Sequence, residues 1–205
     1  MEQGELSIGS TTHGRPARHG RAPGFSLVEL LVILTIVGLV AGMMVPQLHM
    51  GQRQADSEMR ALASTVMSAQ RRAVARQTNV VVSFDVNGRY VRALVDEDGD
   101  GTSDPGEHVR TTPLGEHVVF GRGSAPAHPL GSGPVTFSKT VDGMPSVVFH
   151  RNGAASAEGG VYLTTEMATK QGDRPEDTRL LWITRATGRV SWLRYDDEDG
   201  WTREF

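Results

Sequence analysis

The chain has 205 residues, no cysteine, a formal net charge of −3 at neutral pH and 38% apolar residues. Without cysteine the chain has no disulfide framework, no thiol nucleophile and no cysteine-ligated metal site. The length suits one ordinary domain plus an anchoring segment. A slightly acidic net charge is not typical of a protein that binds nucleic acid over much of its surface.

Residues 1–24 are polar and glycine-rich, with Arg15, Arg18 and Arg21 close to their end. Basic residues that flank a hydrophobic span stay on the cytoplasmic side of a membrane. This segment is therefore predicted to be a cytoplasmic leader with no fold of its own. Everything that follows the span is then predicted to lie outside the membrane.

Residues 25–48 form an almost uninterrupted apolar run whose one charge is Glu29. A helix of this length would extend for roughly 36 Å, enough to cross a hydrocarbon core of about 30 Å. A carboxylate in such a helix costs about 2.5 kcal/mol or more at the bilayer centre, so Glu29 is predicted to have a specific partner. The run is too long for a cleavable secretory signal, and no small-residue cleavage site follows it.

The stretch Gly24-Phe25-Ser26-Leu27-Val28-Glu29-Leu30 resembles the cleavage and methylation motif of type IV pilins and type II secretion pseudopilins. The resemblance implies a prepilin peptidase that cuts between Gly24 and Phe25 and methylates the new amine of Phe25. It implies that Glu29 pairs with the N-terminal ammonium of a neighbouring subunit, since a buried carboxylate is tolerable beside a buried cation. Pro46 stands where pilins often carry a helix-loosening proline. An unprocessed signal anchor is the alternative.

Residues 49–78 are predicted to form an amphipathic helix. Their apolar residues recur at spacings of three and four, which makes one stripe that should dock on the rest of the domain. The stripe consists of Ala55, Met59, Leu62, Val66, Ala69 and Ala73. Arg71, Arg72 and Arg76 near the end suit the negative end of the helix dipole, and a contact with a partner or a phosphate is the alternative.

From residue 79 onward the apolar period becomes that of strands. Val80–Phe84 and Tyr90–Val95 flank Asn87-Gly88, which predicts a hairpin because both residues tolerate positive φ. Residues 121–134 and 167–177 are predicted to be polar loops, and residues 196–205 an acidic, loose end. Further strands are predicted at Glu116–Phe120, Val135–Phe137, Ser146–His150, Gly160–Thr165, Arg179–Thr184 and Arg189–Tyr195.

Residues 146–195 resemble the C-terminal domain of H-type pseudopilins and FimT-type minor pilins, with a turn after Phe149 and a final hairpin at Gly188-Arg189. Residues 108–145 match no known pattern. The fold class that follows is α+β: a long N-terminal helix, its first half (25–48) in the membrane and its second half (49–78) packed on a β-rich head (79–205). The resemblance implies a structural subunit of a type II secretion system or type IV pilus. Its partners would be other pilin or pseudopilin subunits, the prepilin peptidase and the bacterial inner membrane, which it would cross once.

Residues 96–107 fit the pattern D-x-D-x-D-G-x5-E of a calcium-binding EF-hand loop. Hard carboxylate oxygens around one tight turn are what Ca²⁺ requires, and the sharp turn is predicted at Gly101. Strands rather than helices flank this segment, so the prediction is an EF-like loop on a hairpin. An acidic surface turn is the alternative. The predicted ligands are Asp96, Asp98, Asp100, Thr102 through its carbonyl, Asp104 and Glu107.

An enzyme is not expected. The seven histidines are scattered without a metal-ligand spacing, and there is neither a nucleophile elbow nor a phosphate-binding glycine loop. DNA uptake by a FimT-like minor pilin is the alternative function, because Arg185, Arg189 and Arg194 lie near the final hairpin. Asp196–Asp199 follow at once and would repel phosphate, so nucleic-acid binding is the less favoured reading.

Overall fold

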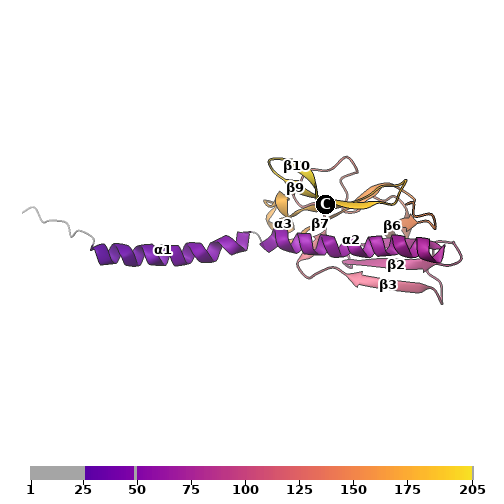
Figure 1. The fold of residues 1–205 in the computed structure, drawn as a ribbon, viewed down its shortest axis with the longest axis horizontal. Helices are drawn as coiled ribbons and strands as arrows, with labels where there is room; N and C mark the ends of the chain where they lie inside the picture. The colour runs from indigo at the N-terminus through magenta and orange to yellow at the C-terminus, as the bar shows by residue number, and fades with distance from the viewer. Residues whose placement is uncertain (1–25, 49, 205) are drawn as a thin grey trace, which may run out of the picture. The chain divides into compact units, whose positions relative to one another are not determined.

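The computed structural model describes residues 26–48 and 50–204. The chain divides into two units, Met1–Met44 and Val45–Phe205. Apart from Ser26, the described part of the first unit is helical and belongs to α1 (Leu27–Leu48), whose last four residues are in the second unit. The second unit, the head, contains helix α2 (Met50–Arg76) and every strand (Figure 1).

The apolar side chains of α1 are not covered by other described residues of its unit. Its side chains from Leu27 to Val40 are all exposed, and its large apolar residues are between 46% and 80% exposed. Among the residues that the structure describes, no helix is long and apolar enough to cross a membrane. The predicted span, 25–48, includes Phe25 and the side chains of 41–48, which lie outside the described residues, so it stays a prediction.

Helix α2 buries the stripe that its sequence predicts. All six of the expected residues are buried, together with Ala63. The helix forms because alanine, glutamine, arginine and methionine are good helix formers and because the apolar positions return to one face every three or four residues. The polar positions of the other face, such as Arg53 and Arg71, are exposed.

The strands form two five-stranded antiparallel sheets. The first has the order β3-β2-β1-β6-β5 and the second the order β10-β9-β8-β7-β4. The first comprises β1 (Asn79–Asp85), β2 (Tyr90–Asp96), β3 (His108–Pro113), β5 (Thr140–Val141) and β6 (Met144–Phe149). The second comprises β4 (Val118–Phe120), β7 (Gly159–Thr165), β8 (Arg179–Ile183), β9 (Val190–Asp196) and β10 (Gly200–Glu204).

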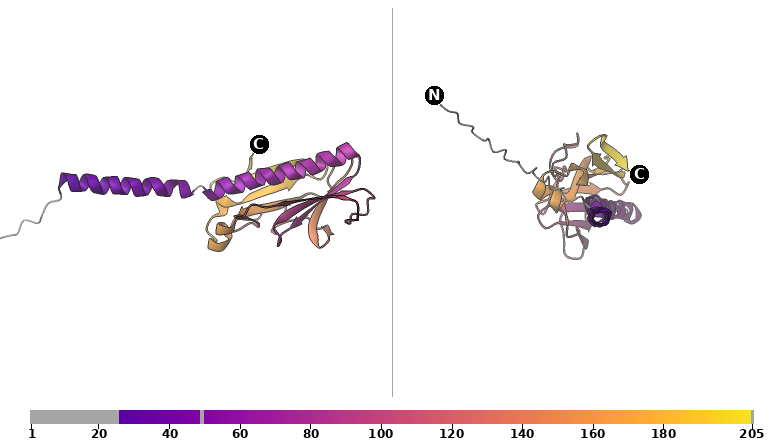
Figure 2. Two further views of the ribbon diagram at one scale, coloured as in Figure 1. Left: turned by 90° about the horizontal axis from the view of Figure 1, so that it is seen from below. Right: turned by 90° about the vertical axis from the view of Figure 1, so that its left-hand side faces the viewer.

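The main core lies where α2 meets one face of each sheet. Figure 2 shows α2 running along the sheets, and the buried cluster draws Met59 and Val66 from the helix, Phe84 from the first sheet and Leu181 from the second. Phe84 stacks on Phe137 with ring centroids 5.9 Å apart. The head thus confirms the predicted α+β class, in which a helix packs on a β-rich domain.

Two of the predicted irregular segments contain regular structure. Helix α3 (Glu166–Gln171) falls in the segment expected to be a loop, because the Thr165 hydroxyl accepts the Ala168 amide at its start and Gly172 ends it in the left-handed conformation. A short 3₁₀ helix follows at Pro175–Asp177. The C-terminal segment predicted to be loose forms β10, which pairs with β9 and packs Trp201 against Tyr162 and Tyr195.

The strand predicted at Val135–Phe137 is wrong. Val135 makes a single bridge to Val161. The Thr136 hydroxyl accepts the Gly160 amide at 2.7 Å, so a side chain takes the donor that a neighbouring strand would have paired. The other predicted strands are present, with bounds shifted by up to two residues. β3 is the second strand of the hairpin predicted around residues 96–107, whereas β5 and β10 were not predicted.

The turn of the first hairpin also differs from its prediction. The β1–β2 pair closes at Asp85 and Tyr90, and the left-handed residue is Arg89 (φ 57°), not Asn87 or Gly88. Four-residue loops of this kind are usually built around a type I turn. A Cβ at Gly88 would lie 2.6 Å from the Tyr90 ring, so a larger residue there would displace that side chain.

Candidate functional site

The residues predicted for processing and assembly lie at the N-terminal end. Gly24 and Phe25 lie outside the described residues. Glu29 is exposed in the first turn of α1, where a carboxylate suits the positive end of the helix dipole. Within the described residues it forms no ion pair. Pro46 lies within α1, which continues past it to Leu48.

The predicted calcium ligands lie on one loop of the head. The loop joins β2 to β3, which pair antiparallel with Val95 opposite His108, so the predicted arrangement on a hairpin is confirmed. Gly101 has φ 80°, as the sharp turn requires, and Gly99 and Gly106 are left-handed as well. Backbone geometry that only glycine adopts easily therefore shapes this loop.

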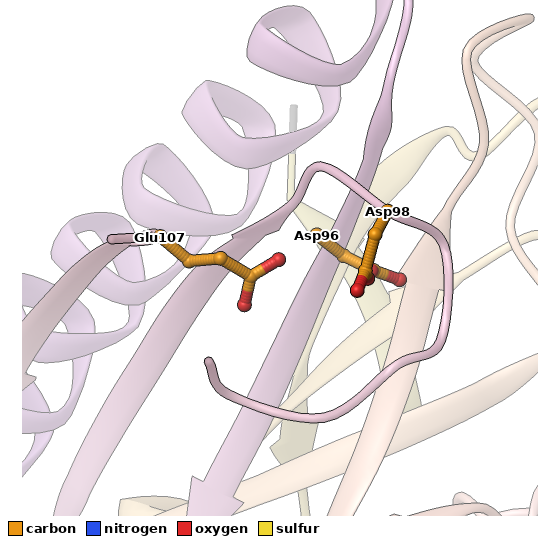
Figure 3. A group of neighbouring side chains, drawn as sticks. All are labelled: Asp96, Asp98 and Glu107. Carbon is orange, nitrogen blue, oxygen red and sulfur yellow. The ribbon is translucent and has the colours of Figure 1, made fainter. Parts of the chain in front are cut away.

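The loop brings its carboxylates together in two groups that share Asp98. One oxygen each from Asp96, Asp98 and Glu107 lie within 4.8 Å of one another, and Figure 3 shows these three side chains together. Oxygens of Asp98, Asp100 and Asp104 meet the same limit. Asp96 is only 2% exposed, whereas Asp98, Asp100 and Asp104 are exposed.

Several of these carboxylates accept hydrogen bonds from the loop itself. The two oxygens of Glu107 accept the amides of Glu97 (2.9 Å) and Asp104 (3.0 Å). Asp100 accepts both the amide and the hydroxyl of Thr102, at 2.7 and 2.9 Å. No carboxylate of the loop forms an ion pair with a cation in the part of the chain that the structure describes.

The pKa values of the loop reflect this crowding. Burial raises the pKa of Asp96, although the amides of Gly101 and Gly99 oppose the shift. The neighbouring carboxylate of Asp100 raises the pKa of Asp104. The pKa of Asp100 itself is lowered, because the amide and hydroxyl of Thr102 donate to it. The ionised loop is thus under repulsion that a bound cation would relieve.

Two histidines flank the acidic loop and the next turn, and three tryptophans lie on the second sheet. His108 and His117 are exposed, and neither belongs to the groups of potential metal ligands found among the described residues. Trp182, Trp192 and Trp201 are half-buried, and they lie on β8, β9 and β10 of the second sheet.

Two sets of arginine contacts that the sequence did not reveal hold the head together. Arg89 donates to the carbonyls of Glu116 (2.6 Å) and Val118 (2.8 Å) and pairs with Glu166, which fastens the β1–β2 turn to the second sheet. Arg179 pairs with Asp56 under α2. Their partners are distant in sequence, so no local pattern announces them.

Comparisons with known proteins identify both parts of the chain. A model described as the prokaryotic N-terminal methylation motif matches residues 21–45. A model described as the type II transport protein GspH matches residues 58–182. These matches confirm the two resemblances seen in the sequence.

One curated relative is the pilin-like protein PilA1 of Thermus thermophilus. It is 32% identical over 94 residues, which are 45% of this chain and 60% of that protein. The chain therefore matches less than two thirds of the length of this relative.

Two solved structures of the minor pseudopilin EpsH, from the type 2 secretion system of Vibrio cholerae, resemble the chain. The first has a TM-score of 0.43 and 12% identity, and the match covers 69% of this chain and 97% of the EpsH chain. The second has a TM-score of 0.35 and 9% identity, and the match covers 74% of this chain and 94% of the EpsH chain. Scores this low add nothing to the assignment, which rests on the family model that spans more than half of the chain. The chain therefore belongs to the family of the type II transport protein GspH.

Proposed function

We propose that this chain is a minor pseudopilin or pilin subunit that assembles with other subunits through its N-terminal helix. The observation that carries the proposal is the uncovered apolar surface of α1, whose large side chains from Leu27 to Val40 are at least 46% exposed. Exposed apolar area on this scale marks a surface that lipid or protein covers. Membership of the GspH family supports the same role.

In this proposal the chain is first made as a precursor in the inner membrane. The methylation-motif match over residues 21–45 supports cleavage after Gly24 and methylation of Phe25. Glu29 then pairs with the Phe25 ammonium of a neighbouring subunit during assembly, and the head lies on the periplasmic side. Prepilin peptidase, the inner membrane and neighbouring pilin subunits are the partners of this scheme.

The role is structural rather than catalytic, and it serves either secretion or pilus assembly. Deletion of the gene, followed by complementation with the intact chain, tests the proposal by two readouts. Surface filaments that disappear and return indicate a pilus, and secreted proteins that remain inside the cell indicate secretion. If neither readout changes, the proposal is wrong. The comparisons give no support to the DNA-binding alternative, and it is not proposed.

A second proposal is that the loop between β2 and β3 binds Ca²⁺ in the folded head. The donor set fits, because two oxygens bound to one Ca²⁺ at about 2.3–2.6 Å lie no more than about 5 Å apart, and those of Asp96, Asp98 and Glu107 lie within 4.8 Å. Asp100, Asp104 and the Thr102 carbonyl are the remaining ligands of the predicted pattern. A calcium-dependent rise in the melting temperature of the head is the test.

A further inference from the structure

A pocket of about 680 Å³ opens at the end of the head where α2 begins (Figure 1). Met50 and Gly51 in the first turn of α2 line one side of it, and Met167 and Lys170 of α3 line another. A volume of this size suits a small molecule or the polar part of a larger one. All of these residues belong to the second unit, so the pocket is built within the head.

Asp177 is the buried carboxylate of this pocket. Its side chain accepts the Thr165 hydroxyl at 2.8 Å, and Asp177 is only 3% exposed. Gly51 makes room for it, since a Cβ there would lie 2.3 Å from Oδ2 of Asp177. Arg179 attracts this carboxylate electrostatically but forms its ion pair with Asp56. A buried carboxylate is costly without a paired cation, so Asp177 is suited to accept hydrogen bonds from an ammonium group that enters the pocket.

The same pocket also offers two cations. Lys170 lies 3.3 Å from Glu166, but its side chain is 76% exposed, and an exposed pair of this kind contributes about 1 kcal/mol or less. Arg174 lines the pocket and forms no ion pair with a carboxylate of the described residues. Both cations can therefore turn to an outside anion. A ligand with one ammonium and one phosphate group finds partners for both charges here.

Two exposed methionines add an apolar part to the lining. Met50 is 55% exposed and Met167 is 51% exposed. The thioether side chain is flexible and adapts to irregular apolar partners. Apolar side chains next to paired charges of both signs suit a ligand whose polar group continues into apolar chains, as that of a phospholipid does.

The place of the pocket along the chain points to the same ligand. In the proposed precursor, residues 25–48 cross the inner membrane. Met50 is two residues beyond that segment, which is at most about 7 Å of extended chain. The headgroups occupy roughly 5–7 Å on each side of the hydrocarbon core. The covalent connection alone therefore keeps Met50 close to the level of the headgroups.

We propose that this pocket binds the headgroup of an inner-membrane phospholipid that carries a primary ammonium beside a phosphate, as phosphatidylethanolamine does. Asp177 accepts hydrogen bonds from the ammonium, Lys170 and Arg174 pair with the phosphate, and Met50 and Met167 contact the first carbons of the acyl chains. The bound lipid holds the head on the membrane until the subunit enters a filament. The inference rests on the proposed role as a membrane-anchored precursor and adds a lipid partner to it.

Native mass spectrometry of the full-length chain in detergent measures which phospholipid it retains. Phosphatidylethanolamine should bind about tenfold more tightly than phosphatidylcholine, because a quaternary ammonium donates no hydrogen bond to Asp177. Phosphatidylglycerol, which has no ammonium, should bind as weakly. Arg174→Glu and Lys170→Glu should each weaken the binding of phosphatidylethanolamine about tenfold. Arg151→Glu, the same reversal at an exposed position outside the pocket, should leave it unchanged.

The absence of cysteine in the chain allows a second test with single fluorescent labels. The full-length chain is placed in vesicles of phosphatidylcholine and phosphatidylethanolamine in equal parts, with a nitroxide on some of the headgroups. A fluorophore at Gln171→Cys, an exposed position of the pocket, should be quenched.

Arg151→Cys is the matched control for this label. Its turn is held by Gln70, which donates to the Gly153 carbonyl at 2.8 Å. Gln70 lies about 24 Å along α2 from Gln54, which lines the pocket, at roughly 1.5 Å per residue. A fluorophore at Arg151→Cys should therefore be quenched much less.

The outcomes separate this site from the proposed function. Equal retention of the three lipids, or unchanged retention in Arg174→Glu and Lys170→Glu, means that lipid only surrounds the anchor, and the proposal falls. Equal quenching at Gln171→Cys and Arg151→Cys overturns it as well. If the pocket variants keep their lipid but no longer co-purify with neighbouring subunits, the pocket holds a protein segment instead. A wild-type chain that is absent from the membrane fraction contradicts the proposed function itself.

Discussion

Arg179 is completely buried beneath α2, and its Nε lies 2.5 Å from Oδ1 of Asp56. The guanidinium also donates to the carbonyls of Glu176 (2.6 Å) and Thr178 (2.9 Å). Burial lowers the pKa of Arg179, and the partner carboxylate of Asp56 opposes that shift. This pair fixes the N-terminal half of α2 to the first residue of β8, and so to the second sheet.

The substitution Asp56→Ala should destabilise the head by about 3 kcal/mol, because it leaves a buried arginine without its counter-charge. Urea unfolding followed by circular dichroism measures the loss. Lys170→Ala is the control, since Lys170 pairs with Glu166 while 76% exposed, and an exposed pair contributes about 1 kcal/mol or less. Losses of equal size would show that the Asp56–Arg179 pair does not anchor α2.

The meeting of two turns at Gly188 gives a second prediction. Gly188 and Gly172 both have positive φ, at 60° and 71°, but a Cβ at Gly172 meets no atom within 4 Å. Gly172→Ala should therefore cost only the backbone strain, about 1 kcal/mol. Gly188→Ala should cost about 2 kcal/mol more, because its methyl group collides with the Gly153 carbonyl. Similar melting temperatures for the two variants would rule out the collision.

The sequence predicts α2 well because helical periodicity is a local property. Each residue of the apolar stripe lies three or four positions from the next, and all six are buried in the structure. The β1–β2 pair is likewise local, and its predicted strands are present. Local patterns of this kind are sufficient to predict the fold class.

Contacts between residues that are far apart in the chain could not be predicted from the sequence. Asp56 and Arg179 are far apart in the chain, and nothing near Arg179 predicts its burial. In the C-terminal segment the run Asp196–Asp199 suggested a loose end, but Trp201 packs against Tyr162 (5.7 Å) and the acids gather in the exposed turn. Packing by one aromatic residue outweighed a local charge signal.

The sequence predicted the residues of the candidate site but not the hydrogen bonds that they form. The calcium-loop pattern located all the carboxylates that the structure brings together. It did not show that Glu107 accepts the amides of Glu97 and Asp104, because a pattern of residue types carries no information on hydrogen bonds. These bonds explain how the loop keeps its shape.

Processing gives the third prediction. Gly24→Val should leave the full-length precursor in the membrane, because the side chain keeps the peptidase from the backbone of the scissile bond. Mass spectrometry of the wild-type chain should show N-methylated Phe25 as the first residue. A mature chain that begins elsewhere, or with an unmodified amine, would contradict processing by prepilin peptidase.

Assembly gives the fourth prediction. Glu29→Leu makes α1 more apolar, so the variant should still insert and be cleaved. It should fail to join the filament, because the carboxylate that meets the neighbouring ammonium is missing. Co-purification of tagged subunits measures incorporation, and Glu116→Leu, an exposed position of the head, is a control with the same change of side chain. Incorporation of Glu29→Leu at the wild-type level would refute the pairing.

Calcium gives the last prediction, in which one substitution should have opposite effects with and without the ion. In EDTA, Asp104→Asn should raise the melting temperature of the head, because the pKa of Asp104 is raised by Asp100 and the ionised form is therefore disfavoured in the folded state.

The sign with pH follows from the same shift. A carboxyl group whose pKa rises on folding contributes stability below its unfolded pKa and loses it as the pH rises through the folded value. In EDTA, the advantage of Asp104→Asn over the wild type should thus grow between these two values as the pH rises. In millimolar CaCl₂ the order should reverse. The wild type gains RT ln(1 + [L]/Kd), about 2.7 kcal/mol at a hundredfold excess over Kd, whereas Asp104→Asn replaces a charged carboxylate by a neutral amide oxygen that binds Ca²⁺ more weakly. Glu107→Ala should abolish the calcium response, and Mg²⁺ should reproduce little of it because it requires a tighter octahedral shell. Equal melting of the wild type in calcium and in EDTA, with no heat of binding by calorimetry, would leave residues 96–107 as an acidic surface turn.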